Sequence, residues 1–261
     1  WIDLFFLPRF QPIEVLKPFL IITLATILCS NKANIFSKHL ISIFIIALIS
    51  LLLIIQPDIG QTLLVLFSWT VLIFTSGINL YLLISIFLFG SLFLAYLIIF
   101  VPKFDYIQGR IFSFFNRETG SHNFQSDKAI DSITSGGFFG KGMGEGTLKN
   151  SVPEAHTDYI ISVISEEFGV VAIMLILLLF LIFIYMVFKK INFETNDKIK
   201  LILIGSISLI LMQATIHIGV NIRLFPTTGM TLPFLSYGGS SIVSTSILAG
   251  IILNLTKRKI N

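Results

Sequence analysis

The sequence has little charge and almost no cysteine. Only 12% of its 261 residues are charged, and 55% are hydrophobic; a soluble globular domain carries roughly a quarter charged residues. This composition excludes a soluble domain and indicates a membrane protein. No basic patch of the kind that binds nucleic acid is present. The single cysteine, Cys29, cannot form an intrachain disulfide and leaves the redox compartment undetermined.

Other absences narrow the function. The sequence has no tandem repeat, no zinc-ligand spacing and no Ser/His/Asp nucleophile motif, and His39, His122 and His217 are interpreted as structural. It opens on Trp1, without a charged leader and cleavage site of the signal-peptide kind. We therefore expect an N-terminally truncated fragment of a longer chain.

Seven stretches are long and apolar enough to cross a bilayer, which takes about 20 residues each. They lie near residues 13–30, 39–55, 59–77, 79–101, 159–188, 199–221 and 234–255. Helices are the economical choice, because every backbone polar group is then satisfied within its own segment. The sequence predicts an all-α polytopic integral membrane protein, with one transmembrane domain over residues 1–261 and one long connector at 102–158.

Basic residues gather in the short connectors on one side of these spans. They are Lys32, Lys38, Lys189, Lys190, Lys198, Lys200, Lys257, Arg258 and Lys259. By the positive-inside rule that side is cytoplasmic, so the connector 102–158 is extracytoplasmic. Trp1 would then also lie outside, and an odd number of further spans upstream would return the N-terminus to the cytoplasm.

Ionisable residues crowd the stretch 152–169, where the long connector meets an apolar span. They are Glu154, His156, Asp158, Glu166 and Glu167. Carboxylates at membrane depth are costly unless they are paired, hydrated or functional. A helix N-cap at Thr157 or Asp158 would account for one of them, but not for the whole cluster.

Two further polar features lie at the outer ends of early spans. Glu14 and Lys17 are three residues apart, so on a helix they share a face and can pair. The alternative is a snorkelling lysine beside a solvated glutamate. Pro57 cannot continue a helix, and Asp58 can cap the helix that follows.

Glycine and proline mark two outer segments. Residues 135–146 contain six glycines, but their spacing fits neither a Walker loop nor a dinucleotide turn, so flexible turns are favoured over a phosphate cradle. Residues 221–241 contain two prolines and several small residues. Such a segment suits a non-helical lining of a polar cavity or close helix packing.

Four stretches, in the same order, resemble the motifs of the SEDS family (RodA, FtsW, SpoVE). They are Gln11-Pro-Ile-Glu-Val-Leu-Lys17, Gln56-Pro-Asp-Ile-Gly-Gln-Thr62, Pro153-Glu-Ala-His-Thr-Asp158 with Glu166-Glu-Phe-Gly169, and Pro226-Thr-Thr-Gly-Met-Thr-Leu-Pro233. Ile13 replaces the family's usual serine, and the last motif resembles the FtsW branch more than the RodA branch. The resemblance covers the whole chain and implies ten helices, three of them before Trp1.

The resemblance implies a glycosyltransferase that polymerises lipid II into peptidoglycan outside the bacterial cytoplasmic membrane, at the division septum. The acceptor's 4-hydroxyl would displace undecaprenyl diphosphate with inversion. By this resemblance Asp158 is the general base or the organiser of a metal, and Glu14 and Lys17 shape the cavity beside it. The candidate substrate-binding residues are Arg110, Lys141, His156 and Arg223. Some of them are chosen only because they are positively charged and expected on the outer side of the membrane. A divalent cation, Mg²⁺ or Mn²⁺, could assist, and no nucleotide is expected.

The implied partners are lipid II, the nascent glycan chain, a class B penicillin-binding protein transpeptidase and other divisome membrane proteins. No nucleic-acid partner is expected. The alternatives are a lipid II flippase, a RodA-type elongation polymerase and a scaffold that only recruits the transpeptidase. The ionisable clusters lie at outer helix ends rather than at the midplane, where a transporter would place its site, and this favours the polymerase.

Overall fold

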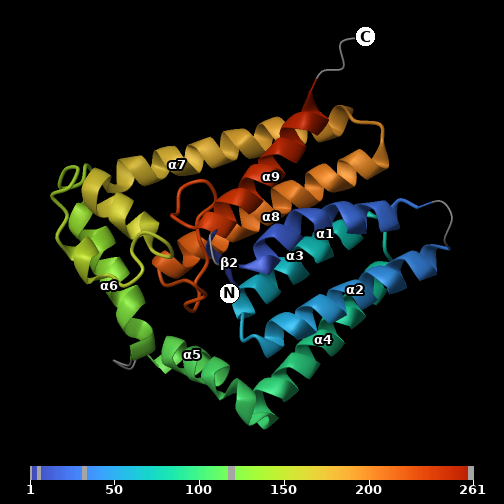
Figure 1. The fold of residues 1–261 in the computed structure, drawn as a ribbon, viewed down its shortest axis with the longest axis horizontal. Coiled ribbons are helices and arrows are strands. Elements are labelled where there is room, and N and C mark those ends of the chain that lie inside the picture. Colours follow the sequence, from blue (N-terminus) through green and yellow to red (C-terminus); the bar gives the residue numbers. More distant parts are fainter. Residues whose placement is uncertain (1, 5–6, 31–33, 117–120, 258–261) are drawn as a thin grey trace.

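The computed structural model of the chain describes residues 2–4, 7–30, 34–116 and 121–257, and helices account for most of them (Figure 1). In chain order the elements are β1 (Ile2–Leu4), β2 (Leu7–Phe10), α1 (Pro12–Leu28), α2 (Ile35–Ile55), α3 (Ile59–Thr75), α4 (Leu80–Phe100), η1 (Pro102–Phe104), α5 (Asp105–Asn116), α6 (Ser121–Gly136), η2 (Leu148–Ser151), α7 (Ile160–Phe193), α8 (Asp197–Asn221) and α9 (Gly239–Thr256). The two short strands pair in an antiparallel hairpin that leads into α1.

Helix α8 forms the centre of the bundle. Most of its length is buried, with α1, α3, α7 and α9 packed around it and α2 packed on α3. Gly205 permits this packing, because a Cβ atom there would lie 2.7 Å from Ile21 and 2.9 Å from Leu72. Small residues at such positions let membrane helices approach closely. The core is therefore built where α8 passes between α1 and α3.

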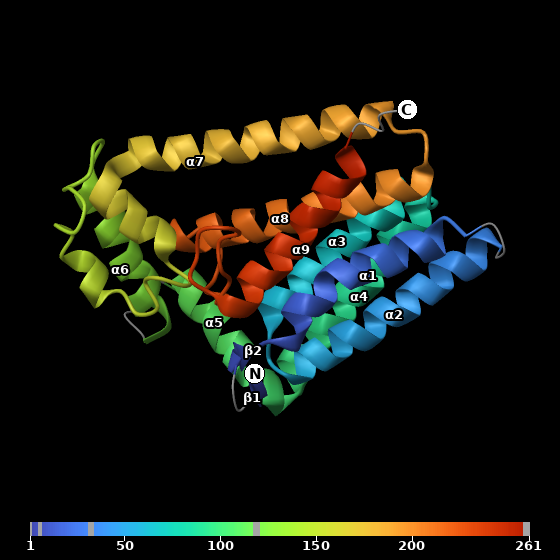
Figure 2. The same cartoon turned by 45° about the horizontal axis from the view of Figure 1, so that its top comes forward.

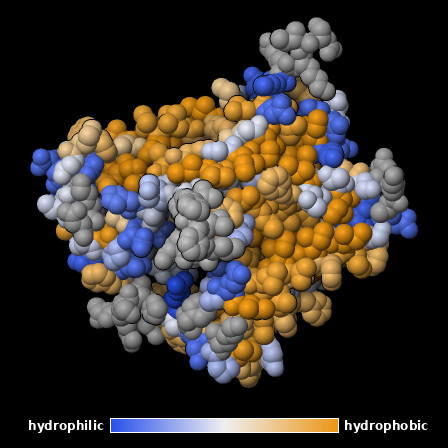
Figure 3. Space-filling model, in the orientation of Figure 1, coloured by the Kyte–Doolittle hydropathy of each residue, from blue (hydrophilic) through white to orange (hydrophobic). Residues whose placement is uncertain are grey.

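The outer faces of the bundle are apolar. Figure 3 shows hydrophobic side chains over much of the visible face, with hydrophilic ones gathered at its left and lower left and at its upper right. In the described part of the chain five helices are long and apolar enough to cross a membrane: α2 from Phe36, α4, α7, α8 and α9. Helices α1 and α3 also lie at expected spans, but each has 17 residues. The count of seven spans stays a prediction.

The arrangement of helix ends agrees with the predicted topology. The end of α1, the start of α2, the α7–α8 turn and the end of α9 lie at one end of the bundle (Figures 1 and 2). These are the segments in which the basic residues gather, although Lys32, Arg258 and Lys259 lie outside the described residues. Which side of a membrane this end faces stays a prediction.

Three features differ from the expectations. The connector 102–158 is not a plain loop, because it folds into η1, α5, α6 and η2. Helix α7 extends to Phe193, five residues beyond the expected end, and it is broken at Gly169, which has φ 77° and ψ −177°. Helix α9 starts at Gly239 rather than near 234, since Phe234 has a φ of 68° and still belongs to the preceding turn.

Asp58 caps α3 as predicted, accepting a hydrogen bond from Gln61 N at 3.1 Å.

Candidate active site

Asp158 lies two residues before α7 and borders a polar cavity of about 150 Å³. The cavity is lined by Arg110, Gln125, Asp158, Tyr159, Val220, Thr227, Thr228, Gly229 and Met230. The Asp158 carboxylate faces Gly229, with Oδ2 3.5 Å from the position that a Cβ atom would take there. Burial raises the pKa of the Asp158 carboxyl to about 6, with a smaller contribution from Glu154. A carboxylate with this pKa is well matched to accept a proton near neutral pH.

The main chain around Asp158 is held from the C-terminal part of the protein. Asn221, at the end of α8, donates from Nδ2 to the Asp158 carbonyl at 3.0 Å. Ser236 Oγ donates to the Thr157 carbonyl at 2.6 Å, and Tyr237 N donates to the His156 carbonyl at 3.0 Å. The N-cap of α7 is Tyr159, with no side-chain cap bond, so the capping explanation of Thr157 and Asp158 is wrong.

The segment between α8 and α9, residues 222–238 and hereafter the outer turn, forms the opposite wall of the cavity. Arg110 on α5 donates to the Thr227 carbonyl at 3.1 Å. His217 on α8 holds the same turn, with its ring Nδ1 2.7 Å from the Met230 carbonyl. This contact supports the structural role that the sequence predicts for His217. Arg110 brings a guanidinium to the cavity that contains the Asp158 carboxylate.

Glu14 and Lys17 form an ion pair in α1, with Lys17 Nζ 2.7 Å from Glu14 Oε2 and both side chains buried. Gln61 on α3 donates to Glu14 Oε1 at 2.6 Å, and Lys17 donates to Gln213 Oε1 on α8 at 3.5 Å. Neither charged residue lines the Asp158 cavity. Their link to it is indirect, because Gln213 also donates to the Thr231 carbonyl at 3.0 Å, in the outer turn.

The other three candidate residues lie apart from this cavity. Lys141 pairs with the fully buried Glu166 at 3.1 Å, and Arg223 pairs with Asp127 on α6. His156 is exposed and contributes its carbonyl to Tyr237. The structure therefore brings Arg110 to Asp158 but does not place Lys141, His156 or Arg223 among the residues that line its cavity.

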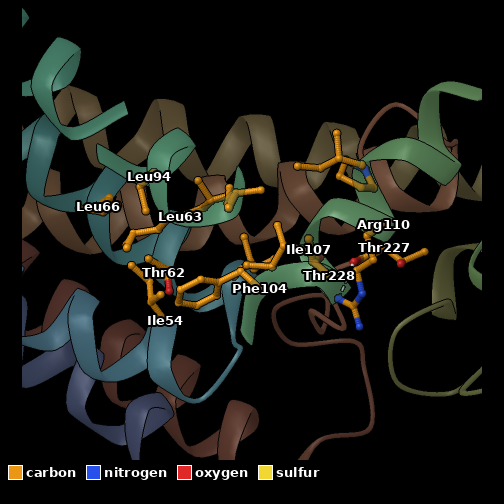
Figure 4. A pocket seen from close by; sticks show the side chains of 15 residues that line it. Ile54, Thr62, Leu63, Leu66, Leu94, Phe104, Ile107, Arg110, Thr227 and Thr228 are labelled. Atoms are coloured by element: carbon orange, nitrogen blue, oxygen red, sulfur yellow. Dashed lines mark hydrogen bonds between the residues drawn. The ribbon is translucent and has the colours of Figure 1, made fainter. Parts of the chain in front are cut away.

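Apolar space adjoins the polar cavity (Figure 4). Arg110, Thr227 and Thr228 also line a cavity of about 240 Å³ whose remaining walls are almost entirely hydrophobic. That cavity shares Leu63, Leu66 and Leu94 with a third one, of about 460 Å³, between α3, α4 and α8. The shared residues make one continuous set of walls that changes from polar, at Asp158, to apolar.

Sequence reasoning missed two amides that organise this region. Asn221 donates to the Asp158 carbonyl and also to the His217 carbonyl, at 2.8 Å. Gln213 joins the ion pair in α1 to the outer turn. The available signal was a buried amide within a strongly apolar helix, since a polar side chain at membrane depth is costly without a partner.

A divalent cation finds few ligands in the protein alone. In the part of the chain that the structure describes, no three His, Cys, Asp or Glu side chains are close enough to hold a metal ion. The cavity offers one carboxylate, Asp158, together with neutral oxygens of Gln125, Thr227 and Thr228. Mg²⁺ is often held by one or two carboxylates and the phosphates of a substrate. Such an ion would therefore fit here only together with a bound diphosphate.

Comparisons with known proteins show the family of the chain. The family model described as "Cell cycle protein" (FtsW, RodA, SpoVE) matches residues 1–261. A probable peptidoglycan glycosyltransferase FtsW from Caulobacter vibrioides is 32% identical over 252 residues, covering 95% of this chain and 63% of the relative. The corresponding protein of Enterococcus hirae is 32% identical over 265 residues, covering 97% and 66%. The chain spans about two thirds of the length of these curated relatives.

Solved structures share the fold. A chain of a peptidoglycan synthase complex that coordinates polymerization and crosslinking matches with a TM-score of 0.73 and 26% identity, covering 99% of this chain and 74% of that one. The rod shape determining protein RodA of Thermus thermophilus matches with a TM-score of 0.64 and 27% identity, covering 97% and 67%. The family match over the whole chain, with these two likenesses in structure, shows that the chain belongs to the FtsW/RodA/SpoVE family of multi-pass membrane proteins.

Proposed function

We propose that this chain is the catalytic part of a peptidoglycan glycosyltransferase that polymerises lipid II. The observation that supports the proposal is the continuous wall from Asp158 to the apolar cavities between α3, α4 and α8. A lipid-linked sugar needs a polar site for its sugar and diphosphate, next to an apolar site for its polyprenyl chain. The relatives carry the name peptidoglycan glycosyltransferase, which is consistent with that substrate class.

The chemistry follows from the single carboxylate in the cavity. The 4-hydroxyl of the acceptor sugar attacks the anomeric carbon of the donor, and the C–O bond to undecaprenyl diphosphate breaks. Asp158 takes the hydroxyl proton, and one displacement converts the α-linked donor into a β-linked product. Glycosidases use two carboxylates because a poor leaving group must be protonated. A diphosphate leaves as a stable anion, so one general base is sufficient here.

Arg110 would stabilise the leaving diphosphate. Its guanidinium lies at the boundary between the polar and the apolar cavity, where the diphosphate of a lipid-linked sugar belongs (Figure 4). A cation fixed in advance beside developing negative charge lowers the barrier without reorganisation. A Mg²⁺ or Mn²⁺ ion, if bound with the substrate, would supply further charge stabilisation there.

The proposed setting is the extracytoplasmic face of the bacterial cytoplasmic membrane, at the division septum. The outer turn, which lines the cavity, lies toward the end of the bundle away from the α7–α8 turn and its lysines (Figure 1), and this supports an extracytoplasmic site. The proposed partner is a class B penicillin-binding protein transpeptidase. The likeness to a chain of a complex that couples polymerization with crosslinking supports this choice.

Polymerisation of purified lipid II tests the proposal. The full-length protein, assayed alone and with its cognate transpeptidase, should convert lipid II into glycan chains that resolve as a ladder on a gel. Movement of lipid II across a vesicle bilayer without chain formation, in both assays, would instead identify a flippase.

A further inference from the structure

The break in α7 is closed by a glycine-rich turn from the preceding connector, residues 136–143. At the break, Val170 N donates to the Gly137 carbonyl at 3.0 Å and Val171 N donates to the Phe138 carbonyl at 3.3 Å. In the other direction, Lys141 N donates to the Glu166 carbonyl at 2.9 Å and Gly142 N to the Glu167 carbonyl at 3.0 Å. The turn therefore supplies the backbone partners that the broken helix lacks.

Glycine is required for this close approach. A Cβ atom at Gly140 would lie 2.2 Å from the Glu167 carbonyl oxygen, and one at Gly169 would lie 2.2 Å from the Phe138 carbonyl oxygen. Both residues also have a φ of 77°. The buried Glu166 fixes the far side of the turn, because its carboxylate accepts from Lys141, Thr147 N and Leu148 N. The turn is thus firmly attached to α7, and the amides of Lys141 and Gly142 are used by α7 rather than offered to a phosphate.

The length of α7 places the turn at a definite depth. Lys189 and Lys190 mark one membrane boundary of this helix, since lysines near helix ends extend to the interface. A helix crosses the hydrocarbon core of about 30 Å in about 20 residues. Counting that number back from Lys189 reaches Gly169. The break in α7, and the turn bonded to it, therefore lie at the opposite boundary of the membrane.

The tip of the turn is apolar and exposed. Phe138 is 76% exposed, Phe139 is 85% exposed and Met143 is 78% exposed. Next to them α7 continues as a helix with exposed apolar side chains, including Val171 at 51% and Met174 at 61%. Because Val171 is bonded to Phe138, the exposed apolar surface of the turn is continuous with that of α7. Large exposed apolar patches mark contacts with lipid or with other proteins.

We propose that the glycine-rich turn inserts Phe138, Phe139 and Met143 into the outer leaflet of the bilayer and anchors the break in α7 there. The partner is a lipid surface, because the turn extends the exposed apolar face of a membrane helix at the depth of its boundary. Non-helical backbone is tolerated at this depth only where its polar groups are satisfied by protein, and the bonds to α7 satisfy several of them. Aromatic side chains are enriched at this interface.

Tryptophan fluorescence in bilayers that contain brominated lipids tests the insertion. Phe139→Trp is made in the purified protein, reconstituted in nanodiscs, and the signal is taken as the difference from the parent. Met174→Trp on α7 is the control for a tryptophan that is quenched in the hydrocarbon region of the bilayer. Asp131→Trp on α6, at an exposed residue whose carboxylate pairs with Lys128, reports water. Phe139→Trp keeps an aromatic ring, and Met143→Trp provides a second position in the same turn.

We expect bromine to quench Phe139→Trp at least about threefold more than Asp131→Trp, and Met143→Trp to behave like Phe139→Trp, because both positions would lie at the lipid boundary. Quenching of both turn variants no greater than that of Asp131→Trp would overturn the proposal. Fluorescence that responds only when a transpeptidase is added would also overturn it, and would identify the turn as a protein-docking surface.

Discussion

The side-chain amide of Asn221 donates a hydrogen bond to the main-chain carbonyl of Asp158 across 3.0 Å, and so joins the end of α8 to the backbone of the residue that carries the proposed catalytic carboxylate. The same amide donates to the His217 carbonyl within α8 at 2.8 Å. Since α8 is the central helix of the bundle, this bond fixes the position of Asp158 against the most buried part of the protein.

Loss of that bond should reduce polymerisation more than stability alone explains. Asn221→Ala leaves the Asp158 carbonyl without its donor, which costs about 1–3 kcal/mol. If that free energy is lost from the positioning of Asp158 in the transition state, the rate drops about 5- to 150-fold. The matched control is Asn79→Ala, which removes an N-cap of α4 at a cost of about 1 kcal/mol. Equal rate losses in the two variants, measured with purified lipid II, would contradict a positioning role.

The stability of the protein should depend strongly on opposite charges at the buried pair Glu14/Lys17. Glu14→Lys or Lys17→Glu leaves two like charges buried together. The free energy of unfolding should therefore fall by at least the roughly 3–5 kcal/mol that breaking a buried pair costs. The double exchange should recover much of the thermal stability, since the amides of Gln61 and Gln213 can rotate to offer either a donor or an acceptor. Reversal of the exposed Lys128/Asp131 pair, as control, should change stability by less than about 1 kcal/mol. A double exchange no more stable than the worse single variant would show that pairing is not what matters.

Part of this arrangement could be predicted from the sequence. Glu14 and Lys17 are one helical turn apart, and Asp58 follows a helix-breaking proline, so local spacing was sufficient for the ion pair and the cap. The break at Gly169, the Lys141–Glu166 pair and the roles of Asn221 and Gln213 depend on contacts between segments distant in the chain, which spacing does not reveal. Helices α5 and α6 were missed because their mixed polarity gives no long apolar run.

The pH dependence of polymerisation should follow the Asp158 carboxyl. Its pKa of about 6 predicts activity that is half-maximal near pH 6 and falls as the pH falls further, because the base must be ionised. The same raised pKa means that the folded protein favours the protonated carboxyl. The Asp158 carboxyl therefore stabilises the fold below about pH 4, and this contribution to stability is lost as the pH rises through about 6. Asp158→Asn should therefore be at least as stable as the parent at pH 7.5. A lower unfolding midpoint for Asp158→Asn at that pH would contradict the assignment of a raised pKa.

A methyl group at Gly229 should shift this profile. Gly229→Ala places a Cβ atom 3.5 Å from Asp158 Oδ2, which removes water from the carboxylate and raises its pKa further. The variant also strains the backbone, because φ is 67°. Gly77→Ala is the matched control, with a φ of 85° and no atom within 4 Å of the new Cβ. Both should lose stability, about 1–2 kcal/mol each, but only Gly229→Ala should move the activity midpoint to higher pH. A shift in both variants, or in neither, would contradict the contact with Asp158.

The most direct test of the catalytic assignment is the rate of lipid II polymerisation by Asp158→Asn. The substitution keeps the shape of the side chain and removes the base, and Asp131→Asn, an exposed aspartate on α6, serves as control. The account predicts that Asp158→Asn unfolds at or above the parent's midpoint and polymerises about 10²–10⁴-fold more slowly, while Asp131→Asn polymerises at the parent's rate. Glycan chains made at the parent's rate by folded Asp158→Asn protein would contradict the account.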